Sequence, residues 1–241
     1  FIYENYNSIY RIEYIDNNHN KQKDYVFYSY ESSMSDKLIF IKMSLLTSEY
    51  PLNIYEDPEN KIHIYPNQLI NAELDTELPT KNFYNVSPSF SPDGNTVAYF
   101  TDQAGYMDLI LYNLDSRKQK KRLIRGNNSP DFEELKWLQP GLSWSPDGKH
   151  IAFASKSGKE DSIIIVDVKS GDYKKIPIPL DGVFTTAWHP TLNKIVFIGH
   201  EDDASDLYVI DTDTQELINL TNDTFSDFSP SWSASGDKII F

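Results

Sequence analysis

The segment SWSPDGKHIAFA, residues 143–154, decides the fold because similar segments recur along the chain. SFSPDGNTVAYF begins at Ser89, AWHPTLNKIVFI at Ala187 and SWSASGDKIIF at Ser231. Their anchoring aromatic residues are separated by 54, 44 and 44 positions: Phe90, Trp144, Trp188 and Trp232. A period near 44 accommodates four short strands and their turns.

Each copy predicts the same order of elements. The aromatic residue ends a first strand, Ser-Pro-Asp-Gly forms a tight turn, and an apolar second strand follows. Proline presets φ in that turn, and Gly94 or Gly148 takes the positive-φ position without steric cost. A recurring aspartate then opens a third strand (Asp108, Asp161, Asp206), and a polar hairpin leads to a fourth. The apolar inner strands indicate burial on both faces, so we predict an all-β, β-propeller fold of four-stranded blades.

We predict one incomplete propeller domain over residues 1–241, with about four to five blades and insertions at 53–86 and 125–140. The first blade is degenerate, with strands expected at 9–15, 24–28 and 36–41. Region 53–86 is expected to hold one strand, 61–65, and an irregular connection. Within the second insertion, residues 129–135 predict a short helical turn, since a serine cap precedes proline and acidic residues. The chain stops at Phe241 inside a repeat copy, so we expect the parent protein to extend further.

The charge balance argues against two classes of partner. The chain carries 22 basic and 36 acidic residues, a formal net charge of -14. Such a field repels phosphate backbones and anionic lipid surfaces, so we predict no nucleic-acid partner. The one basic cluster, Lys118, Lys120, Lys121 and Arg122, is predicted to lie in a hairpin turn. No segment approaches about 18 consecutive apolar residues, so membrane insertion is not predicted.

The sequence contains no recognisable catalytic or cofactor motif. Cysteine is absent, and G-x-S-x-G, H-E-x-x-H and glycine-rich phosphate loops are missing. The histidines are isolated, and His189 holds a turn position that serine holds in the sister repeats, which indicates a structural role. We therefore predict no enzyme activity and no cofactor. Calcium at the acidic run 201–206 remains an alternative to a solvated loop, whereas 211–216 is predicted to be a turn because it lacks the EF-hand glycine.

The string W-S-P-D-G-K-x-I-A-F at Trp144–Phe153, followed by Asp161 and Asp167, resembles the WD-repeat-like blades of the bacterial TolB propeller family. The resemblance extends well over residues 87–241 and weakly over 10–55. It implies six blades in the intact parent and a protein partner at one face of the ring. The family's fused N-terminal α/β domain is not recognisable in this chain.

Loop aromatics that the repeat does not require are candidate binding residues. In a propeller, the loops between second and third strands and the connections between blades emerge on one face. There, exposed aromatic residues among polar ones are typical of protein recognition. The candidate partner-binding residues are Tyr106, Phe132, Phe184, Phe225, Phe228, Asp102, Asp181, Asp202, Asp203 and Asp227.

These observations predict a non-catalytic scaffold, periplasmic or secreted and bacterial, that binds a protein or peptide at the channel-mouth loops. The alternative is an accessory or gating propeller of a larger secreted peptidase or hydrolase whose catalytic domain lies outside these residues. A calcium- or carbohydrate-binding propeller is a third possibility. Flanking sequence with a catalytic motif separates the first two.

Overall fold

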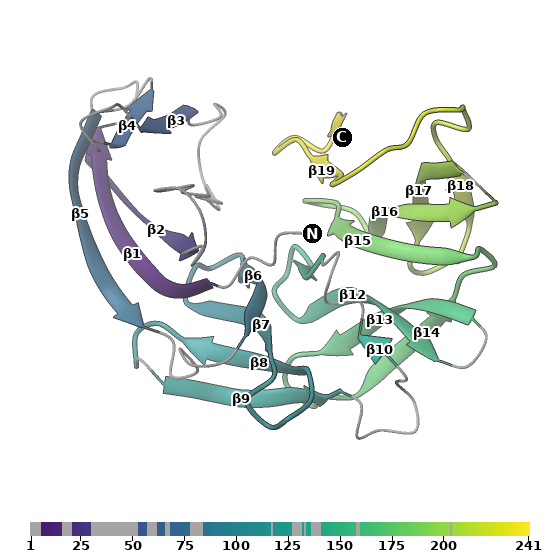
Figure 1. Cartoon of the computed structure of the whole chain (residues 1–241), viewed down its shortest axis with the longest axis horizontal. Helices are drawn as coiled ribbons and strands as arrows, with labels where there is room; N and C mark the ends of the chain where they lie inside the picture. The colour runs from purple at the N-terminus through teal and green to yellow at the C-terminus, as the bar shows by residue number, and fades with distance from the viewer. Residues whose placement is uncertain are drawn as a thin grey trace. The chain divides into compact units, whose positions relative to one another are not determined.

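The computed structural model describes residues 6–15, 21–29, 53–56, 62–65, 68–77, 84–116, 118–126, 132, 134–135, 141–157, 160–202 and 204–241. All regular elements in these ranges are β-strands, joined antiparallel, which confirms the predicted all-β class (Figure 1). The chain divides into two compact units, Phe1–Asn85 and Val86–Phe241. The single domain over 1–241 stays a prediction. Within the described ranges, no helix has the length and apolarity to cross a membrane.

The N-terminal unit contains a three-stranded sheet and a hairpin. β1 (Tyr6–Ile15) lies between β2 (Lys21–Ser29) and β5 (Gln68–Glu77), and the hairpin consists of β3 (Asn53–Glu56) and β4 (Ile62–Tyr65). The expected strands at 9–15, 24–28 and 61–65 are confirmed, while 36–41 lies outside the described residues.

The expectation of an irregular connection after β4 is wrong, because β5 pairs with β1 over most of its length. Its sequence alternates apolar and polar residues from Ile70 to Asp75, which is the period of a strand. Asparagine, aspartate and glutamate have low strand propensity and concealed that period. Pairing with a long neighbouring strand outweighs such local preferences.

The C-terminal unit consists of successive antiparallel sheets, one for each repeat copy (Figure 1). Sheet 1 is formed by β6 (Asn85–Phe90), β7 (Thr96–Thr101), β8 (Asp108–Asn113) and β9 (Lys118–Arg125). Sheet 3 is formed by β15 (Gly182–Trp188), β16 (Lys194–Glu201), β17 (Ala204–Asp211) and β18 (Leu217–Asn219). The fourth copy forms the hairpin of β19 (Ser231–Trp232) and β20 (Ile239–Ile240).

Sheet 2 departs from this plan at its first strand. β12 (His150–Ser157), β13 (Glu160–Asp167) and β14 (Tyr173–Pro177) occupy the second to fourth positions. The first position is shared by β11 (Ser143–Trp144) and β10 (Glu134–Leu135), which pair with different parts of β12. The helical turn predicted at 129–135 is therefore wrong at residues 134 and 135, which form β10. Residues 129–131 and 133 lie outside the described ranges. Leu135 is almost fully buried between the sheets, and this burial outweighs the local capping signal.

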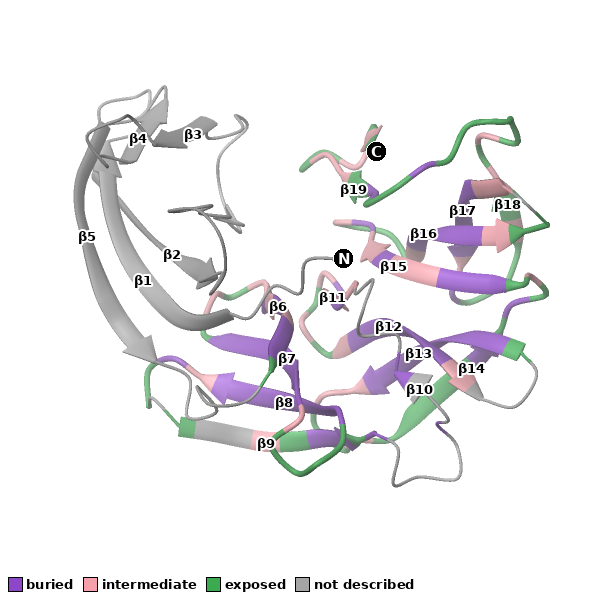
Figure 2. Ribbon diagram, in the orientation of Figure 1, coloured by how far each residue is buried: buried purple, intermediate pink, exposed green. Residues whose placement is uncertain are grey.

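The sheets pack face to face, which explains the continuous apolar runs of the inner strands (Figure 2). On β12, Ile151 and Phe153 face the core shared with sheet 1, whereas Ala152 and Ala154 face the core shared with sheet 3. Phe153 meets Phe100 of sheet 1 edge to face, with ring centroids 5.6 Å apart. Because side chains alternate along a strand, a central sheet buried on both faces needs apolar residues at every position.

The Ser-Pro-Asp-Gly turns repeat one hydrogen-bond pattern. In sheet 2 the Ser145 hydroxyl donates to Asp147 Oδ1 at 2.7 Å, and the His150 N–H donates to Ser145 Oγ at 2.9 Å. The Asp147 carboxylate also accepts the Lys149 N–H at 3.0 Å, and Gly148 has φ +68°. The hydroxyl and N–H bonds lower the pKa of Asp147 from 3.8 to about 2. The turn is thus held by an ionised aspartate.

The basic cluster does not lie in a turn, contrary to the expectation. Lys118 to Arg122 belong to β9, and the hairpin precedes them. Two of these cations have partners in the chain: Arg122 Nε lies 3.1 Å from Asp108 Oδ2, and Lys121 Nζ donates to the Lys169 carbonyl at 2.9 Å. These contacts give the cluster a role in linking neighbouring strands and sheets.

Candidate functional site

Antiparallel order places the connections of sheets 1–3 on two opposite ends. The loops between second and third strands and the segments between sheets emerge at one end, which we call the loop face: 102–107, 202, 178–181 and 220–230. The tight turns and the hairpins between third and fourth strands emerge at the other, which we call the turn face. The sequence prediction places the binding residues on the loop face.

Three of the five predicted aromatics are exposed on the loop face. The exposed fraction is 49% for Tyr106, 75% for Phe225 and 61% for Phe228. Phe184 lies within β15 rather than in a loop. Its half-buried ring packs against the apolar cluster that β16 and β17 share with the β19–β20 hairpin.

Phe132 is not a surface residue, and its assignment to the rim is wrong. Its side chain is only 4% exposed, lies in the core between sheets 1 and 2, and approaches Tyr173 with ring centroids 5.1 Å apart. A phenylalanine gains more from burial than from exposure wherever a neighbouring sheet offers an apolar surface. That neighbour is not visible in the local sequence.

The predicted aspartates have different surroundings. Asp102 is half-buried, while Asp181 and Asp202 are exposed and joined, since the Asp202 N–H donates to Asp181 Oδ2 at 3.0 Å. Asp227 is buried, contrary to a role as an exposed rim charge. Asp203 lies outside the described residues.

The connection from sheet 3 to β19 presents its two phenylalanines on an anchored loop. The Thr221 hydroxyl donates to Asp227 Oδ2 at 2.7 Å and accepts the Leu207 N–H at 3.1 Å. The Asp227 N–H donates to the Ser205 carbonyl at 2.8 Å. Both ends of the loop are therefore tied to β17, while Phe225 and Phe228 project into solvent.

The recurring strand-opening aspartates hold the segments between sheets. The Gly126 N–H donates to Asp108 Oδ1 at 3.1 Å, and the Val183 N–H donates to Asp161 Oδ2 at 2.9 Å. Gly126 directly follows β9, and Val183 lies at the start of β15, so both partners come after the fourth strand of the sheet that bears the aspartate. Asp206 differs: its Oδ2 accepts from the Asn219 amide at 2.8 Å.

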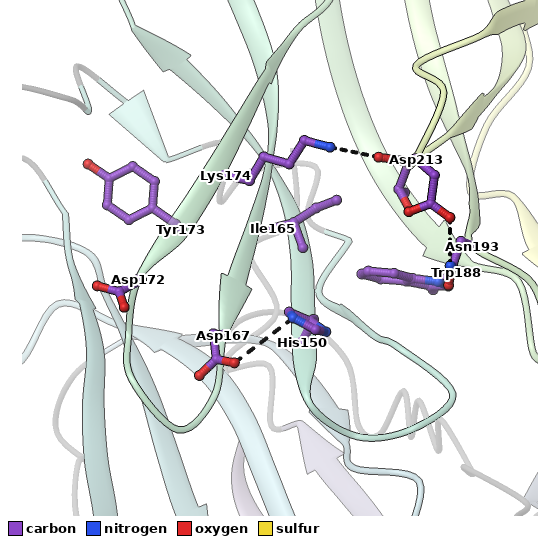
Figure 3. Close-up of a pocket in the computed structure, with 10 residues that line it drawn as sticks. His150, Ile165, Asp167, Asp172, Tyr173, Lys174, Trp188, Asn193 and Asp213 are labelled. Carbon is purple, nitrogen blue, oxygen red and sulfur yellow. Dashed lines mark hydrogen bonds and ion pairs between the residues drawn. The ribbon is translucent and has the colours of Figure 1, made fainter.

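The turn face contains a pocket between sheets 2 and 3, with a volume of about 380 Å³ (Figure 3). Trp188 stacks on His150 with ring centroids 6.5 Å apart, and His150 Nε2 lies 4.0 Å from Asp167 Oδ2. The Ser170 N–H holds the pKa of Asp167 below its usual value, with a smaller contribution from His150. The sequence predicts no binding role for His150 or Trp188, so this pocket is not among the predicted sites.

The third tight turn borders this pocket and differs from the other three. His189 replaces serine, and its Nδ1 accepts the N–H groups of Thr191 at 3.1 Å and Leu192 at 3.0 Å. Because Nδ1 accepts, the ring proton is on Nε2, which lies 3.1 Å from the Gly236 carbonyl and donates to it. This geometry confirms the predicted structural role of His189.

The acidic segment 211–216 of the third sheet forms a turn. Asp211 Oδ1 accepts the N–H groups of Asp213 at 3.0 Å and Thr214 at 2.9 Å, and these bonds lower its pKa, with Thr214 contributing most. Segment 211–216 is thus a hairpin, as predicted. Among the described residues, no group of three or more His, Asp or Glu side chains is arranged to hold a metal ion. Calcium at 201–206 stays an alternative to a solvated loop, since Asp203 is not described.

Sequence comparison relates the chain to TolB proteins. Residues 136–241 match the family model of the TolB beta propeller domain. An uncharacterized protein of Agrobacterium fabrum is 26% identical over 175 residues, or 68% of this chain and 56% of that protein. The Tol-Pal system protein TolB of Francisella tularensis subsp. holarctica is 25% identical over 209 residues, or 85% of this chain and 44% of that protein. The chain spans about half the length of these curated relatives.

Solved structures show the same fold. TolB from Acinetobacter baumannii is similar with a TM-score of 0.56 and 19% identity, over 97% of this chain and 57% of that one. Putative TolB from Agrobacterium tumefaciens has a TM-score of 0.55 and 16% identity, over 95% and 96%. An oligogalacturonate lyase also shares the fold, with a TM-score of 0.51 and 15% identity over 71% and 47%, so the likeness is one of fold and not of activity. The repeated antiparallel sheets and the similarity to these relatives show that the chain has the fold of a TolB-like β-propeller.

Proposed function

We propose that this chain is a non-catalytic scaffold, periplasmic or secreted, that binds a protein or peptide at its loop face. The observation that carries the proposal is the anchored loop at 220–230, which exposes Phe225 and Phe228 to solvent. Large apolar side chains on a fixed loop cost little conformational entropy when a partner covers them, and aromatic residues dominate the energetics of protein interfaces.

Charge around these rings supports a protein partner. Asp181, Asp202 and Asp223 are exposed on the connections of the same end. An aromatic centre with a polar rim is the usual composition of a protein interface. The net charge of -14 favours a partner surface that carries basic residues. The relatives named TolB belong to a Tol-Pal system, which is consistent with a function in protein assembly.

The experiment compares capture of partners by two variants of the immobilised chain. Phe225→Ala combined with Phe228→Ala removes the loop-face aromatics; Leu192→Ala removes an exposed apolar side chain, 49% accessible, on the turn face. We expect the double variant to lose specific partners from a periplasmic extract by about tenfold or more, since hot-spot truncations cost about 2 kcal/mol. The Leu192 variant should retain them. Equal capture by both variants would overturn the proposal.

A further inference from the structure

Trp188 is oriented differently from the equivalent tryptophans of the other repeats. Trp144 Nε1 donates to the Ser89 carbonyl at 3.1 Å, and Trp232 Nε1 donates to the Ala187 carbonyl at 3.1 Å, each reaching the preceding repeat. Trp188 Nε1 instead donates to the Leu192 carbonyl of its own turn at 3.2 Å. The indole N–H of Trp188 therefore bonds within its own repeat, and it does not form the bond to the preceding repeat that Trp144 and Trp232 form.

The different hydrogen bond of Trp188 follows from the sequence of the third turn. Leu192 occupies the position of Gly94, Gly148 and Gly236, whose φ values are +72°, +68° and +77°. Leucine does not adopt that left-handed conformation here, so the turn follows another path and directs its carbonyl toward Trp188. Thr191 and Leu192 then donate to His189 instead of forming the usual serine-centred turn.

The pocket beside Trp188 combines an aromatic face with carboxylates from two sheets. Asp167 and Asp172 come from the hairpin of sheet 2, and Asp213 comes from the hairpin of sheet 3 (Figure 3). Two cationic or titratable groups share the lining: Lys174 and His150. Three carboxylates outnumber these two groups, so the pocket carries a net negative charge.

The lining groups are already oriented by bonds within the chain. Lys174 Nζ donates to the Thr212 carbonyl at 2.7 Å, which holds its charge at the edge of sheet 3. The Asn193 amide donates to Asp213 Oδ2 at 2.9 Å, which fixes that carboxylate close to the turn that bears Trp188. The volume of about 380 Å³ is at the small end for ligand sites and suits one side chain.

We propose that this turn-face pocket binds a guanidinium group, presented as an arginine side chain by a protein or peptide. A guanidinium is planar and weakly hydrated, so it stacks on an indole while its N–H fork engages a carboxylate. In this pocket the indole is Trp188 and the carboxylate beside it is Asp213, whereas Asp172 lies on the far side of the pocket (Figure 3). This binding site is separate from the loop face.

The test uses the 241-residue chain and follows the indole N–H resonance of Trp188 by NMR. N-acetyl-arginine amide is titrated against N-acetyl-citrulline amide, which has nearly the same shape and no charge. We expect saturable shifts with the arginine compound and binding weaker by about tenfold or more with citrulline, because a charge-assisted pair is lost. Equal binding of the two compounds, or no saturable shift with arginine, would overturn the proposal.

Variants localise the interaction. Asp213→Asn is expected to weaken binding of the arginine compound several-fold, whereas Asp172→Asn, on the far side of the pocket, should weaken it less. The matched control is Asp115→Asn, because Asp115 is exposed at the position in the sheet 1 hairpin that corresponds to Asp213. An equal loss in the control would show a general charge effect and refute the pocket. Tighter binding of free L-arginine than of the blocked compound would refute a peptide source for the guanidinium.

Failure of the arginine pocket can be told apart from failure of partner binding at the loop face. Phe225 and Phe228 lie on the opposite end of the sheets, so their alanine variants should bind the arginine compound like the unmodified chain. Loss of pocket binding in those variants would contradict a site separate from the loop face. Conversely, partner capture through the loop face is expected to survive Asp213→Asn.

Discussion

Trp144 and Ser89 are joined across two repeats: the indole N–H of Trp144 donates to the Ser89 carbonyl at 3.1 Å. Trp232 and Ala187 repeat the contact, also at 3.1 Å. In both cases the acceptor is the residue immediately before the anchoring aromatic of the preceding repeat. The repeat therefore encodes a link between neighbouring sheets as well as the strands within each one.

Replacing these tryptophans tests the link. Trp144→Phe is expected to lower the free energy of unfolding by about 1–3 kcal/mol, because a partly buried hydrogen bond is lost and the smaller ring packs less well. Trp188→Phe should cost less, since its indole N–H bond is exposed and stays within one turn. Urea denaturation followed by circular dichroism measures both. Equal losses would show that the contact between repeats adds nothing.

The third turn can be tested by restoring the repeat sequence. His189→Ser alone is expected to destabilise the chain by about 1–2 kcal/mol, because Thr191 and Leu192 lose their acceptor and the Gly236 carbonyl loses its donor. Adding Leu192→Gly should recover stability, since glycine permits the left-handed turn found at Gly94 and Gly148.

A double-mutant cycle on urea denaturation midpoints measures this coupling. Leu192→Gly in the His189 background provides the control and is expected to give no comparable gain, because the histidine-centred turn does not use that conformation. A double variant that is no more stable than His189→Ser would contradict the interpretation.

Acid should weaken the tight turn of sheet 2. The pKa of Asp147 is about 2 in the folded chain against 3.8 without its bonds, so the carboxylate stabilises the fold above pH 3.8. This contribution is lost as the pH falls through 3.8 toward 2. Asp147→Asn removes the titrating group, and the stability advantage of the unmodified chain should shrink over that interval.

Urea midpoints at several pH values between 5 and 2 provide the measurement. Asp115→Asn is the control, an exposed aspartate of another hairpin. An advantage over Asp147→Asn that is independent of pH would show that the carboxylate charge does not hold the turn. Because Asp147 is half-exposed, added salt should reduce the stability difference between the unmodified chain and Asp147→Asn.

Much of the fold could be predicted from local sequence because the turns carry their own signals. Proline, aspartate and glycine at fixed offsets specify the turn that His150 and Ser145 close. Apolar runs such as Ile151 to Ala154 indicate burial on both faces. Strand β5 escaped prediction because its polar residues obscured an alternating period, and β10 escaped because capping residues indicated a helix.

The binding residues were harder to predict because exposure is not a local property. Phe132 lies in the segment SPDFEEL and Phe225 in NDTFSDF, so both rings have acidic neighbours in sequence. One is buried between sheets 1 and 2, and the other is among the most exposed apolar residues described. The pocket beside Trp188 escaped for the same reason, since its residues come from separate turns of two sheets.

The sequence by itself determined the repeat, the turn chemistry and the antiparallel pairing within each sheet, since these depend on residues close together in the chain. Only the tertiary structure decided which aromatic rings become core, where each aspartate finds its N–H partner, and which turns enclose a pocket. Those outcomes depend on the surface that a neighbouring sheet presents. That surface is assembled from residues about 45 positions away, and the hydrophobic gain from contacting it outweighs local preference.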